Sequence, residues 1–472
     1  MRIGLVSGDG LPVSGLLTVF RSVFELGRDL GLVESRVTAD LGYSWRPDKP
    51  GFFPSGPPGE YTPPWLEVDD VLGTADPLDA AELLRIRDEV ARHDALTPAE
   101  HASLTERIDA AEALYRRGFE DWLARHRFDW VFALNMTLSD GVSVTRALHG
   151  AAAAHYTSTP GGLLFWDHDL FRSYAVHDPV TGSRVYPTRP NRYTPVPQPD
   201  GCTEWAVISE PLAAETRTYP TSLVPHIVPN ILPRVPVAPL EGCHHAFARR
   251  YELAAGRPIV LAPVRIFPVK GVDVALDFLA ALKEEAVRGG RPVPYLLVFG
   301  SLSEDPPYAE QVLARTHRLG LQKDVRFLDG VPLASFADAA GEQLLDEVDL
   351  LRLAKATQGG VLFTPSVTDV ETVGLGPGLA AAAGIPVAVT DYEVFHTIYG
   401  HSFGRTSVPL SGDDMRPAAA EFLDSLGGAQ ANHTASLEHN RALTASAFPE
   451  RPWIELWQHL ADRLGRSGSD QA

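Results

Sequence analysis

Two cations lie in a short stretch where a predicted strand gives way to a predicted helix. Arg265 and Lys270 follow the apolar run 258–261, and beyond them apolar residues recur at helical spacing from Ala275 to Leu282. In open α/β sheets ligands bind at the carboxyl ends of strands, and a helix N-terminus favours anions. The stretch therefore predicts a phosphate site, with a pair of solvated surface cations as the alternative.

A second strand–loop–helix unit follows further along the chain. Its loop carries Asp369, Glu371, Gly374 and Leu375 between apolar segments that predict a strand and an alanine-rich helix. Each loop alone is a weak signal, but the two loops in this order form a more specific pattern.

Together the two loops resemble those of family 4 of the retaining glycosyltransferases, which have the GT-B fold. The resemblance implies that Arg265 and Lys270 bind a donor diphosphate and that Glu371 holds the hydroxyls of the donor sugar. It also implies that the backbone at Gly374 and Leu375 faces the phosphate and the sugar. It covers most of the second half of the chain well and the first half loosely.

The chain departs from the family pattern at one position. A second glutamate usually follows the first by eight residues and binds the ribose, and Leu379 occupies that position here. The spacing from Pro365 to Glu371 is also longer than is usual in the family. Leu379 accepts no hydrogen bond, so we expect ribose recognition from another group, such as Asp369, or weaker recognition.

The first half supplies candidate residues that follow predicted strands. Gly15 comes after a glycine-rich turn, Asn135 ends one strand, and His168 and Asp169 follow another. By resemblance, His168 contacts the donor sugar and is oriented by Asp169, while Gly15, Asn135 and Asp169 belong to the cleft or the acceptor side. The alternatives are a structural histidine in a loop and a glycine that only makes a turn.

We expect no metal ion and no cofactor. Residues 167–169, Asp-His-Asp, imitate a metal-binding motif of the other main glycosyltransferase fold, but two carboxylates alone make a poor site. Cys202 and Cys243 have no metal spacing and indicate a reducing cytoplasm. His244 and His245 are adjacent, so they cannot share one helix face, and we interpret both as surface residues.

The composition excludes some classes of partner. The chain has 472 residues, a formal net charge of -19 and 44% hydrophobic residues. The acidic balance argues against a nucleic-acid binder and against attachment to an anionic membrane through a basic face. The longest apolar window, 379–389, is too short and too interrupted for a membrane span, and the N-terminus predicts a strand without a signal peptide. We therefore expect a cytoplasmic protein.

The predicted architecture is α/β, with two doubly wound Rossmann-like domains that face each other across a cleft. Residues 1–232 form an acceptor-side domain with a helical insertion near 77–126. Residues 233–450 form a nucleotide-sugar-binding domain. Residues 451–472 form a helix that returns to the first domain and ends in a flexible tail. Whether the chain forms a homo-oligomer stays open.

Local signals in the first half predict further elements. Thr97 and Glu100 match a capping box at a helix start, with Pro98 in the first turn. The segment 152–157, which contains His155, is predicted as a short strand. The segment 43–64 is rich in proline and aromatic residues and is either a packed surface loop or a flap over the acceptor.

The resemblance implies retaining transfer of a sugar from a nucleoside diphosphate sugar to a small-molecule acceptor. We expect bacterial specialised metabolism, such as antibiotic biosynthesis, with oxygen, nitrogen or sulfur as the accepting atom. The sequence shows no carboxylate pair of the glycosidase type, so catalysis would rest on Arg265, Lys270 and a helix N-terminus, with His168 and Glu371 also at the reacting sugar.

Two other functions stay open. The first is a nucleotide-sugar epimerase of the same fold, with His168 and either Asp169 or Glu371 as its acid–base pair. The second is a nucleotide-sugar-binding protein without activity, which the leucine at position 379 favours.

Overall fold

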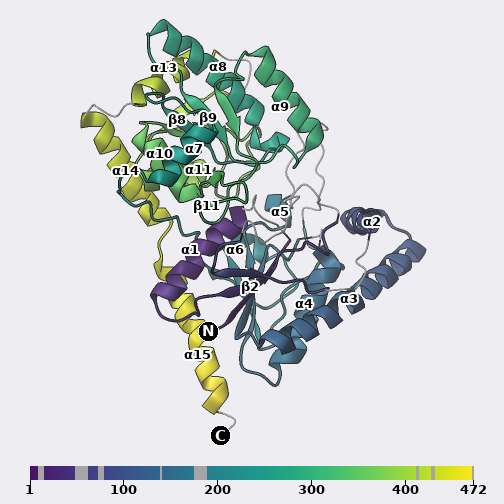
Figure 1. The fold of residues 1–472 in the computed structure, drawn as a ribbon. Coiled ribbons are helices and arrows are strands. Elements are labelled where there is room, and N and C mark those ends of the chain that lie inside the picture. Colours follow the sequence, from purple (N-terminus) through teal and green to yellow (C-terminus); the bar gives the residue numbers. More distant parts are fainter. Residues whose placement is uncertain are drawn as a thin grey trace. The chain divides into compact units, whose positions relative to one another are not determined.

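The computed structural model describes residues 1–8, 15–47, 62–72, 79–138, 141–174, 189–410, 414–426 and 431–469. These residues divide into two compact units (Figure 1). Unit 1 contains the described residues of Met1–Val176, Ser183–Ile231 and Pro449–Ala472, and unit 2 contains those of Leu232–Phe448. Each unit is described by itself below.

The core of unit 1 is a parallel sheet whose described strands have the order β3-β2-β1-β4-β5-β6-β7. The strands are β1 (Ile3–Ser7), β2 (Val37–Asp40), β3 (Leu66–Val68), β4 (Trp130–Leu134), β5 (Gly162–Asp167), β6 (Thr203–Val207) and β7 (His226–Ile227). Every residue of β1, β4 and β5 is buried, as expected for parallel strands with both faces covered. The strand order reverses between β1 and β4, so the topological switch point lies at the carboxyl ends of these two strands.

The helices of unit 1 include one long pair. The described helices are α1 (Gly15–Asp29), α2 (Ala80–Ala91), α3 (Pro98–His126), α4 (Val142–Tyr156), α5 (Phe171–Tyr174), α6 (Glu210–Thr216) and α15 (Arg451–Ser469). α3 packs along α4. The predicted capping box is confirmed, because the Glu100 amide donates to Thr97 Oγ1 and the Thr97 amide donates to Glu100 Oε2.

The predicted strand at 152–157 is wrong, because α4 continues through this segment to Tyr156. Residues 151–154 are four alanines, the strongest helix formers, and Ala151 and Ala152 are buried. The next strand is β5, which begins only at Gly162. The alanine run is therefore better explained by helix propensity than by a short buried strand.

Helix α15 belongs to unit 1 although its residues are the last of the chain. It packs against α1, and the side chains of Trp453 and Trp457 are fully buried. Trp457 Nε1 lies 3.2 Å from the carbonyl oxygen of Val23, and its ring centroid lies 5.2 Å from that of Phe132. Trp453 Nε1 donates to the Pro229 carbonyl at 2.8 Å. Two tryptophans thus fasten this helix to α1 and to the sheet.

The core of unit 2 repeats the same plan. Its described parallel strands have the order β10-β9-β8-β13-β14-β15. They are β8 (Ile259–Ala262), β9 (Tyr295–Val298), β10 (Val325–Phe327), β13 (Gly360–Phe363), β14 (Val387–Thr390) and β15 (Thr406–Val408). A separate antiparallel pair joins β11 (Phe336–Ala337) to β12 (Gln343–Leu344). Here the order reverses between β8 and β13, the switch point of this sheet.

The helices of unit 2 mostly alternate with these strands. Those described are α7 (Gly242–Arg250), α8 (Val272–Arg288), α9 (Pro306–Arg318), α10 (Glu347–Ala356), α11 (Gly376–Ala383), α12 (Phe395–Tyr399), α13 (Arg416–Ser425) and α14 (Ala431–Ala447). α8 packs against α9 and α13, and α11 packs against α10 and α14. The two sheets confirm the predicted fold class of two doubly wound α/β units. Across the described ranges we find no helix that combines the length and the apolar character of a membrane span.

Trp457 provides a test of the contribution of α15 to unit 1. We expect Trp457→Ala to lower the free energy of unfolding by about 3–5 kcal/mol, because it removes a large side chain from a closed core. Arg451→Ala on the same helix is the control, since this side chain is 86% exposed, and it should change stability by less than about 0.5 kcal/mol. Denaturant unfolding of the full chain measures both. Equal effects of the two variants would contradict this account of α15.

Candidate functional site

The loops that leave β8 and β13 meet at the switch point of unit 2. β8 and β13 are paired parallel neighbours, so their carboxyl ends lie at the same edge of the sheet. The loop after β8 contains Arg265 and Lys270, and the loop after β13 contains Asp369, Glu371 and Gly374. In sheets of this topology the crevice at the switch point is the usual place of ligand binding.

Backbone contacts tie the two loops together. After a short 3-10 turn, Pro268–Lys270, the chain reaches Gly271 with a φ of 63°, and α8 begins at the next residue. A Cβ at position 271 would lie 1.8 Å from the carbonyl oxygen of Thr364, so only glycine fits. In addition, the Thr364 hydroxyl donates to the Gly271 carbonyl at 2.9 Å, and the Ser366 hydroxyl donates to the Pro268 carbonyl at 2.7 Å.

Arg265 is held by a buried glutamate that the sequence analysis missed. Its Nε donates to Glu304 Oε2 at 2.7 Å, and the Glu304 side chain is fully buried. Glu304 Oε1 accepts from the Ser301 amide at 2.7 Å. Burial raises the pKa of Glu304, and the attraction of Arg265 opposes this effect. The sequence offered a signal in the polar residues Ser301, Ser303 and Glu304, which follow the apolar run 295–299.

Lys270 and Glu371 form an ion pair between the two loops. Lys270 Nζ lies 2.6 Å from Glu371 Oε1, and the side chains are 27% and 11% exposed. The structure thus brings together two of the residues that the sequence analysis proposed for donor binding. In this arrangement a carboxylate that could accept from hydroxyls lies beside a cation that could face a phosphate.

The segment before α11 is fixed by two tyrosines. Tyr399 Oη donates to the Gly374 carbonyl at 2.6 Å, and Tyr392 Oη lies 3.2 Å from the Val373 carbonyl. Gly374 has a φ of 70°, and a Cβ there would lie 2.5 Å from Tyr392 Oη. Leu375 follows as the residue that precedes α11. The backbone that the resemblance assigns to phosphate and sugar is therefore held in one conformation.

Leu379, at the position of the second family glutamate, lies in α11 and is 4% exposed. Its side chain belongs to the core. Asp369 is half-buried in the loop before Glu371. The structure therefore provides a carboxylate in this loop, but none at position 379.

Asn135 organises the site residues of unit 1. It follows β4 with a φ of 51°, a conformation that asparagine tolerates better than most residues. Its Oδ1 accepts from the His168 amide at 2.7 Å and from the Asp169 amide at 3.1 Å, and its Nδ2 donates to Asp169 Oδ2 at 3.0 Å. β4 and β5 are neighbours, so one side chain joins the two loops that follow them.

His168 is buried and has a different environment from the one predicted. Its side chain is 6% exposed, and no hydrogen bond within the described ranges reaches either ring nitrogen. Burial lowers the pKa of His168 to about 3, against a smaller opposing effect of Asn230. The prediction that Asp169 orients this ring is wrong, because the Asp169 carboxylate pairs with Asn135 instead.

Asp167 faces the interior of unit 1. It is fully buried, and its Oδ2 accepts from Trp205 Nε1 at 2.8 Å. Burial raises the pKa of Asp167 to about 7, although the hydrogen bond from Trp205 opposes the shift. The carboxylates of the Asp-His-Asp sequence thus have separate partners.

Gly15 begins α1, and a Cβ there would meet no described atom within 4 Å. The turn before it, 9–14, lies outside the described residues, as does 48–61 of the proline-rich segment. Trp45, at the start of that segment, is buried and donates from Nε1 to Asp40 Oδ1 at 2.7 Å. This end of the segment is packed, in agreement with a structured loop.

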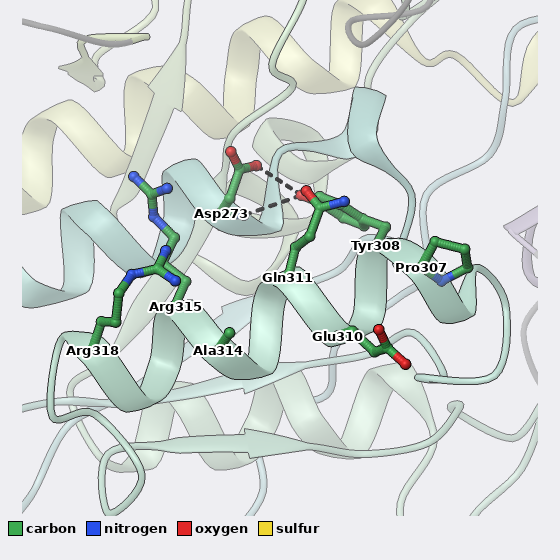
Figure 2. A pocket seen from close by; sticks show the side chains of 8 residues that line it. All are labelled: Asp273, Pro307, Tyr308, Glu310, Gln311, Ala314, Arg315 and Arg318. Carbon is green, nitrogen blue, oxygen red and sulfur yellow. Dashed lines mark hydrogen bonds between the residues drawn. The ribbon is translucent and has the colours of Figure 1, made fainter.

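A separate hollow of about 660 Å³ lies beside α8 and α9 (Figure 2). The Tyr308 hydroxyl donates to Asp273 Oδ1 at 2.7 Å along its lining, and Arg315 pairs with Asp277 close by. Among the described residues that line this hollow, none is a predicted site residue. We therefore do not assign the donor to it.

The prediction that His244 is a surface residue is wrong. Its side chain is fully buried. Its Nδ1 accepts from the Glu241 amide at 3.1 Å at the start of α7, and its Nε2 lies 3.2 Å from Asp349 Oδ1. Cys243 Sγ lies 3.3 Å from the same Nδ1. Cys243, His244 and Asp349 each offer one potential ligand atom, and these atoms lie within 4.8 Å of one another. The prediction was based on the fact that His244 and His245 cannot lie on one helix face. It did not consider that His244 caps the start of α7.

Several solved structures share the fold of this chain. A glycosyltransferase from Rickettsia africae has a TM-score of 0.53 at 12% identity and covers 97% of this chain and 98% of its own. Sucrose-phosphate synthase from Thermosynechococcus elongatus has a TM-score of 0.55 at 14% identity, over 100% and 99%. HepE from Anabaena, in complex with UDP-glucose, has a TM-score of 0.52 at 14% identity, over 99% and 100%. The fold is GT-B.

The sequence comparisons are sparser than the structural ones. No family model matches the chain. The D-inositol 3-phosphate glycosyltransferase of Jonesia denitrificans is 29% identical over 165 residues, which are 35% of this chain and 33% of that protein. The match therefore spans about a third of the length of that relative.

The low pKa of His168 predicts a pH dependence of stability. Unfolded histidine takes up a proton near pH 6.5, whereas folded His168 does so only near pH 3. Between these values the unfolded state binds more protons, so stability falls as the pH falls, by at most about 1.4 kcal/mol per pH unit. We expect His168→Gln to remove this part of the acid sensitivity in denaturant unfolding from pH 7 to pH 4.

His439→Gln is the control for that measurement, because its ring lies at the surface and contacts Ser402 Oγ at 3.0 Å. It should leave the pH dependence close to that of the wild type. Parallel curves for the wild type and His168→Gln would contradict a histidine that stays neutral in the folded state.

Proposed function

We propose that this chain is a retaining glycosyltransferase of family 4 that transfers a sugar from a nucleoside diphosphate sugar to a small-molecule acceptor. We place it in bacterial specialised metabolism, with a thiol among the candidate acceptors. One observation carries the proposal. Arg265, Lys270 and Glu371 lie on two interlocked loops at the switch point of unit 2, in a GT-B fold.

Two of the similar proteins support the chemistry. HepE has the same fold and was crystallised with UDP-glucose. The relative from Jonesia denitrificans is named a D-inositol 3-phosphate glycosyltransferase. A nucleoside diphosphate sugar is thus a suitable donor for the site where the loops after β8 and β13 meet.

The proposed role of the cations follows from where charge develops. When the bond from the anomeric carbon to the diphosphate breaks, negative charge accumulates on the leaving phosphate. Arg265 and Lys270 would neutralise it, and the N-terminal end of α8 adds the positive end of the helix dipole. Each cation is already held by a carboxylate, Glu304 or Glu371, so little reorganisation is needed when the donor binds.

Glu371 is proposed to hold the donor sugar. It lies beside Lys270, so a sugar that contacts this carboxylate would be attached to a phosphate that the lysine can reach. Glu371 would accept hydrogen bonds from sugar hydroxyls. Leu379 offers the ribose nothing, and Asp369 is the carboxylate that could do so from the same loop. We propose His168 and Asn135 as further residues of the sugar and acceptor sides.

Arg265 provides the first test. Arg265→Gln should weaken UDP binding and lower kcat/KM roughly 100- to 1000-fold. It should also destabilise the protein, because it leaves the buried Glu304 carboxylate without its cation. The double variant Arg265→Gln/Glu304→Gln removes this buried charge, so we expect stability to recover while UDP binding stays weak. Isothermal calorimetry and unfolding measure the two effects separately.

The control is Arg288→Gln at the other end of α8, where the side chain is 60% exposed. It should leave both quantities unchanged. Recovery of UDP binding in the double variant would show that Arg265 acts only through stability and would overturn its role as a phosphate ligand.

Glu371 provides the second test. We expect Glu371→Gln to lower turnover sharply, because an amide is a poorer acceptor for sugar hydroxyls than a carboxylate. A 2′-deoxyribose donor should lose little against the ribose donor, since Leu379 cannot bind the ribose. Values of kcat/KM for both donors, with the exposed Glu393→Gln as control, check this. A large penalty for the deoxy donor would show that another group binds the ribose.

Product analysis separates the proposed transfer from the other two functions. A transferase forms a glycoside only when an acceptor is present. An epimerase converts the nucleotide sugar without one, and a binding protein leaves it intact.

A further inference from the structure

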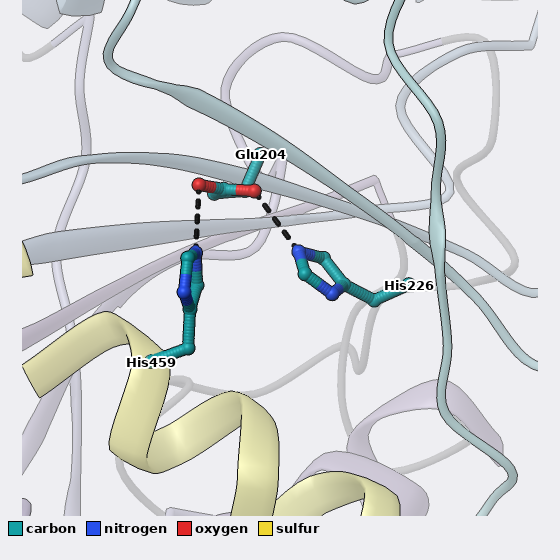
Figure 3. Close-up of side chains that lie close together, drawn as sticks. All are labelled: Glu204, His226 and His459. Atoms are coloured by element: carbon teal, nitrogen blue, oxygen red, sulfur yellow. Dashed lines mark hydrogen bonds and ion pairs between the residues drawn. The ribbon is translucent and has the colours of Figure 1, made fainter.

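Glu204, His226 and His459 converge in unit 1 from three separate elements (Figure 3). Glu204 lies on β6, His226 on the edge strand β7 and His459 on α15. Glu204 Oε2 lies 3.0 Å from His226 Nε2, and Glu204 Oε1 lies 3.0 Å from His459 Nε2. Both imidazole rings thus point their Nε2 atoms at the carboxylate of Glu204.

We propose that Glu204, His226 and His459 form a binding site for a divalent transition metal, with Zn²⁺ as the preferred ion, that fastens α15 to the edge of the sheet. The donor set of two imidazoles and one carboxylate is one that zinc uses in proteins when a position is left for water. Neutral imidazole and carboxylate donors favour first-row transition metals over calcium or magnesium, which prefer oxygen ligands.

The distances fit such a site. Zinc binds imidazole nitrogen at about 2.0–2.1 Å and carboxylate oxygen at about 2.0–2.2 Å, so ligand atoms in a tetrahedral site lie roughly 3.4 Å apart. One ligand atom from each residue lies within 4.8 Å of the other two, and each imidazole Nε2 lies 3.0 Å from a different oxygen of Glu204. Side-chain movements that bring the three ligand atoms to the tetrahedral spacing would admit the ion.

The site is accessible from solvent. The side chains of Glu204, His226 and His459 are 15%, 35% and 44% exposed, so a hydrated ion can reach them and keep water in its remaining positions.

Arg463 is the built-in competitor of the ion. Its guanidinium pairs with Glu204 Oε1 and also contacts the carbonyl of Gly201. A metal at the site would share Glu204 with this cation or displace it, so the arginine lowers the affinity. Replacing Arg463 by a neutral residue should raise the affinity for the metal ion. If the cluster were only a network of ion pairs, the same replacement would weaken it.

The consequence for the fold is a cross-link. Residues 204 and 226 belong to neighbouring strands, and residue 459 belongs to the last helix. An ion bound to all three would close a connection between the sheet edge and α15. It would do so beyond the tryptophans that already hold the beginning of the helix.

Zinc titration of the full-length protein at pH 7.5 tests the proposal. By isothermal calorimetry we expect one Zn²⁺ per chain, and by thermal melting a rise in Tm. Mutation of residues that only support a metal ligand costs about 10- to 100-fold in metal affinity. Removing a ligand itself, as in His226→Gln or His459→Gln, should therefore weaken Zn²⁺ binding at least tenfold. Arg463→Gln should bind at least as tightly as the wild type. Hydrogen exchange in α15 should slow with Zn²⁺ in the wild type and in Arg463→Gln, but not in the two histidine variants.

Two controls identify the site. His149→Gln removes an imidazole whose Nε2 lies 3.0 Å from Asp200, a pair of the same type that lacks a second histidine, and it should leave Zn²⁺ binding unchanged. Cys243→Ser examines the other cluster of potential ligands. Zn²⁺ binding that survives in the double variant His226→Gln/His459→Gln, or its absence from the wild type, would overturn the proposal. Loss of binding in Arg463→Gln alone would do the same.

Discussion

The backbone contact between the loops after β8 and β13 is the constraint on which the candidate site depends. Gly271 approaches the Thr364 carbonyl so closely that no side chain fits between them, and the hydroxyls of Thr364 and Ser366 return hydrogen bonds to the first loop. The loops therefore cannot move independently. As a result Lys270 and Glu371 meet before any ligand arrives, and a donor that uses both would not have to order them.

Features that depend on neighbouring residues could be predicted from the sequence. The α/β class followed from apolar runs alternating with helical periodicity, and the two doubly wound domains were implied by the family resemblance. The start of α3 followed from Thr97 and Glu100. The placement of Arg265 and Lys270 between a strand and a helix followed in the same way. Their function remains a prediction. The predicted strand at 152–157 was wrong for a local reason. A run of small apolar residues fits a buried strand as well as a helix, and only the helix propensity of alanine separates the two.

Features that depend on distant residues could not be predicted. Glu304 lies 39 positions from Arg265, and only the meeting of the segments after β8 and β9 makes them partners. His168 lost its expected partner because Asn135, from the neighbouring strand, competes for Asp169. His244 is buried because it caps its own helix and faces another. In each case a tertiary neighbour decides the state of a polar group, and no local pattern records that neighbour.

Because α15 belongs to unit 1, unit 1 cannot complete its fold until the end of synthesis on the ribosome. Domains generally fold as units during synthesis, and usually the N-terminal one completes first. Here the chain leaves unit 1 at Ile231 and re-enters it only at Pro449, with all the described residues of unit 2 between. Until Trp453 and Trp457 emerge, the surface of α1 and the sheet that they cover stays open to water. The unit that begins first is therefore finished last, and the nascent chain carries an unsealed apolar face throughout the synthesis of unit 2.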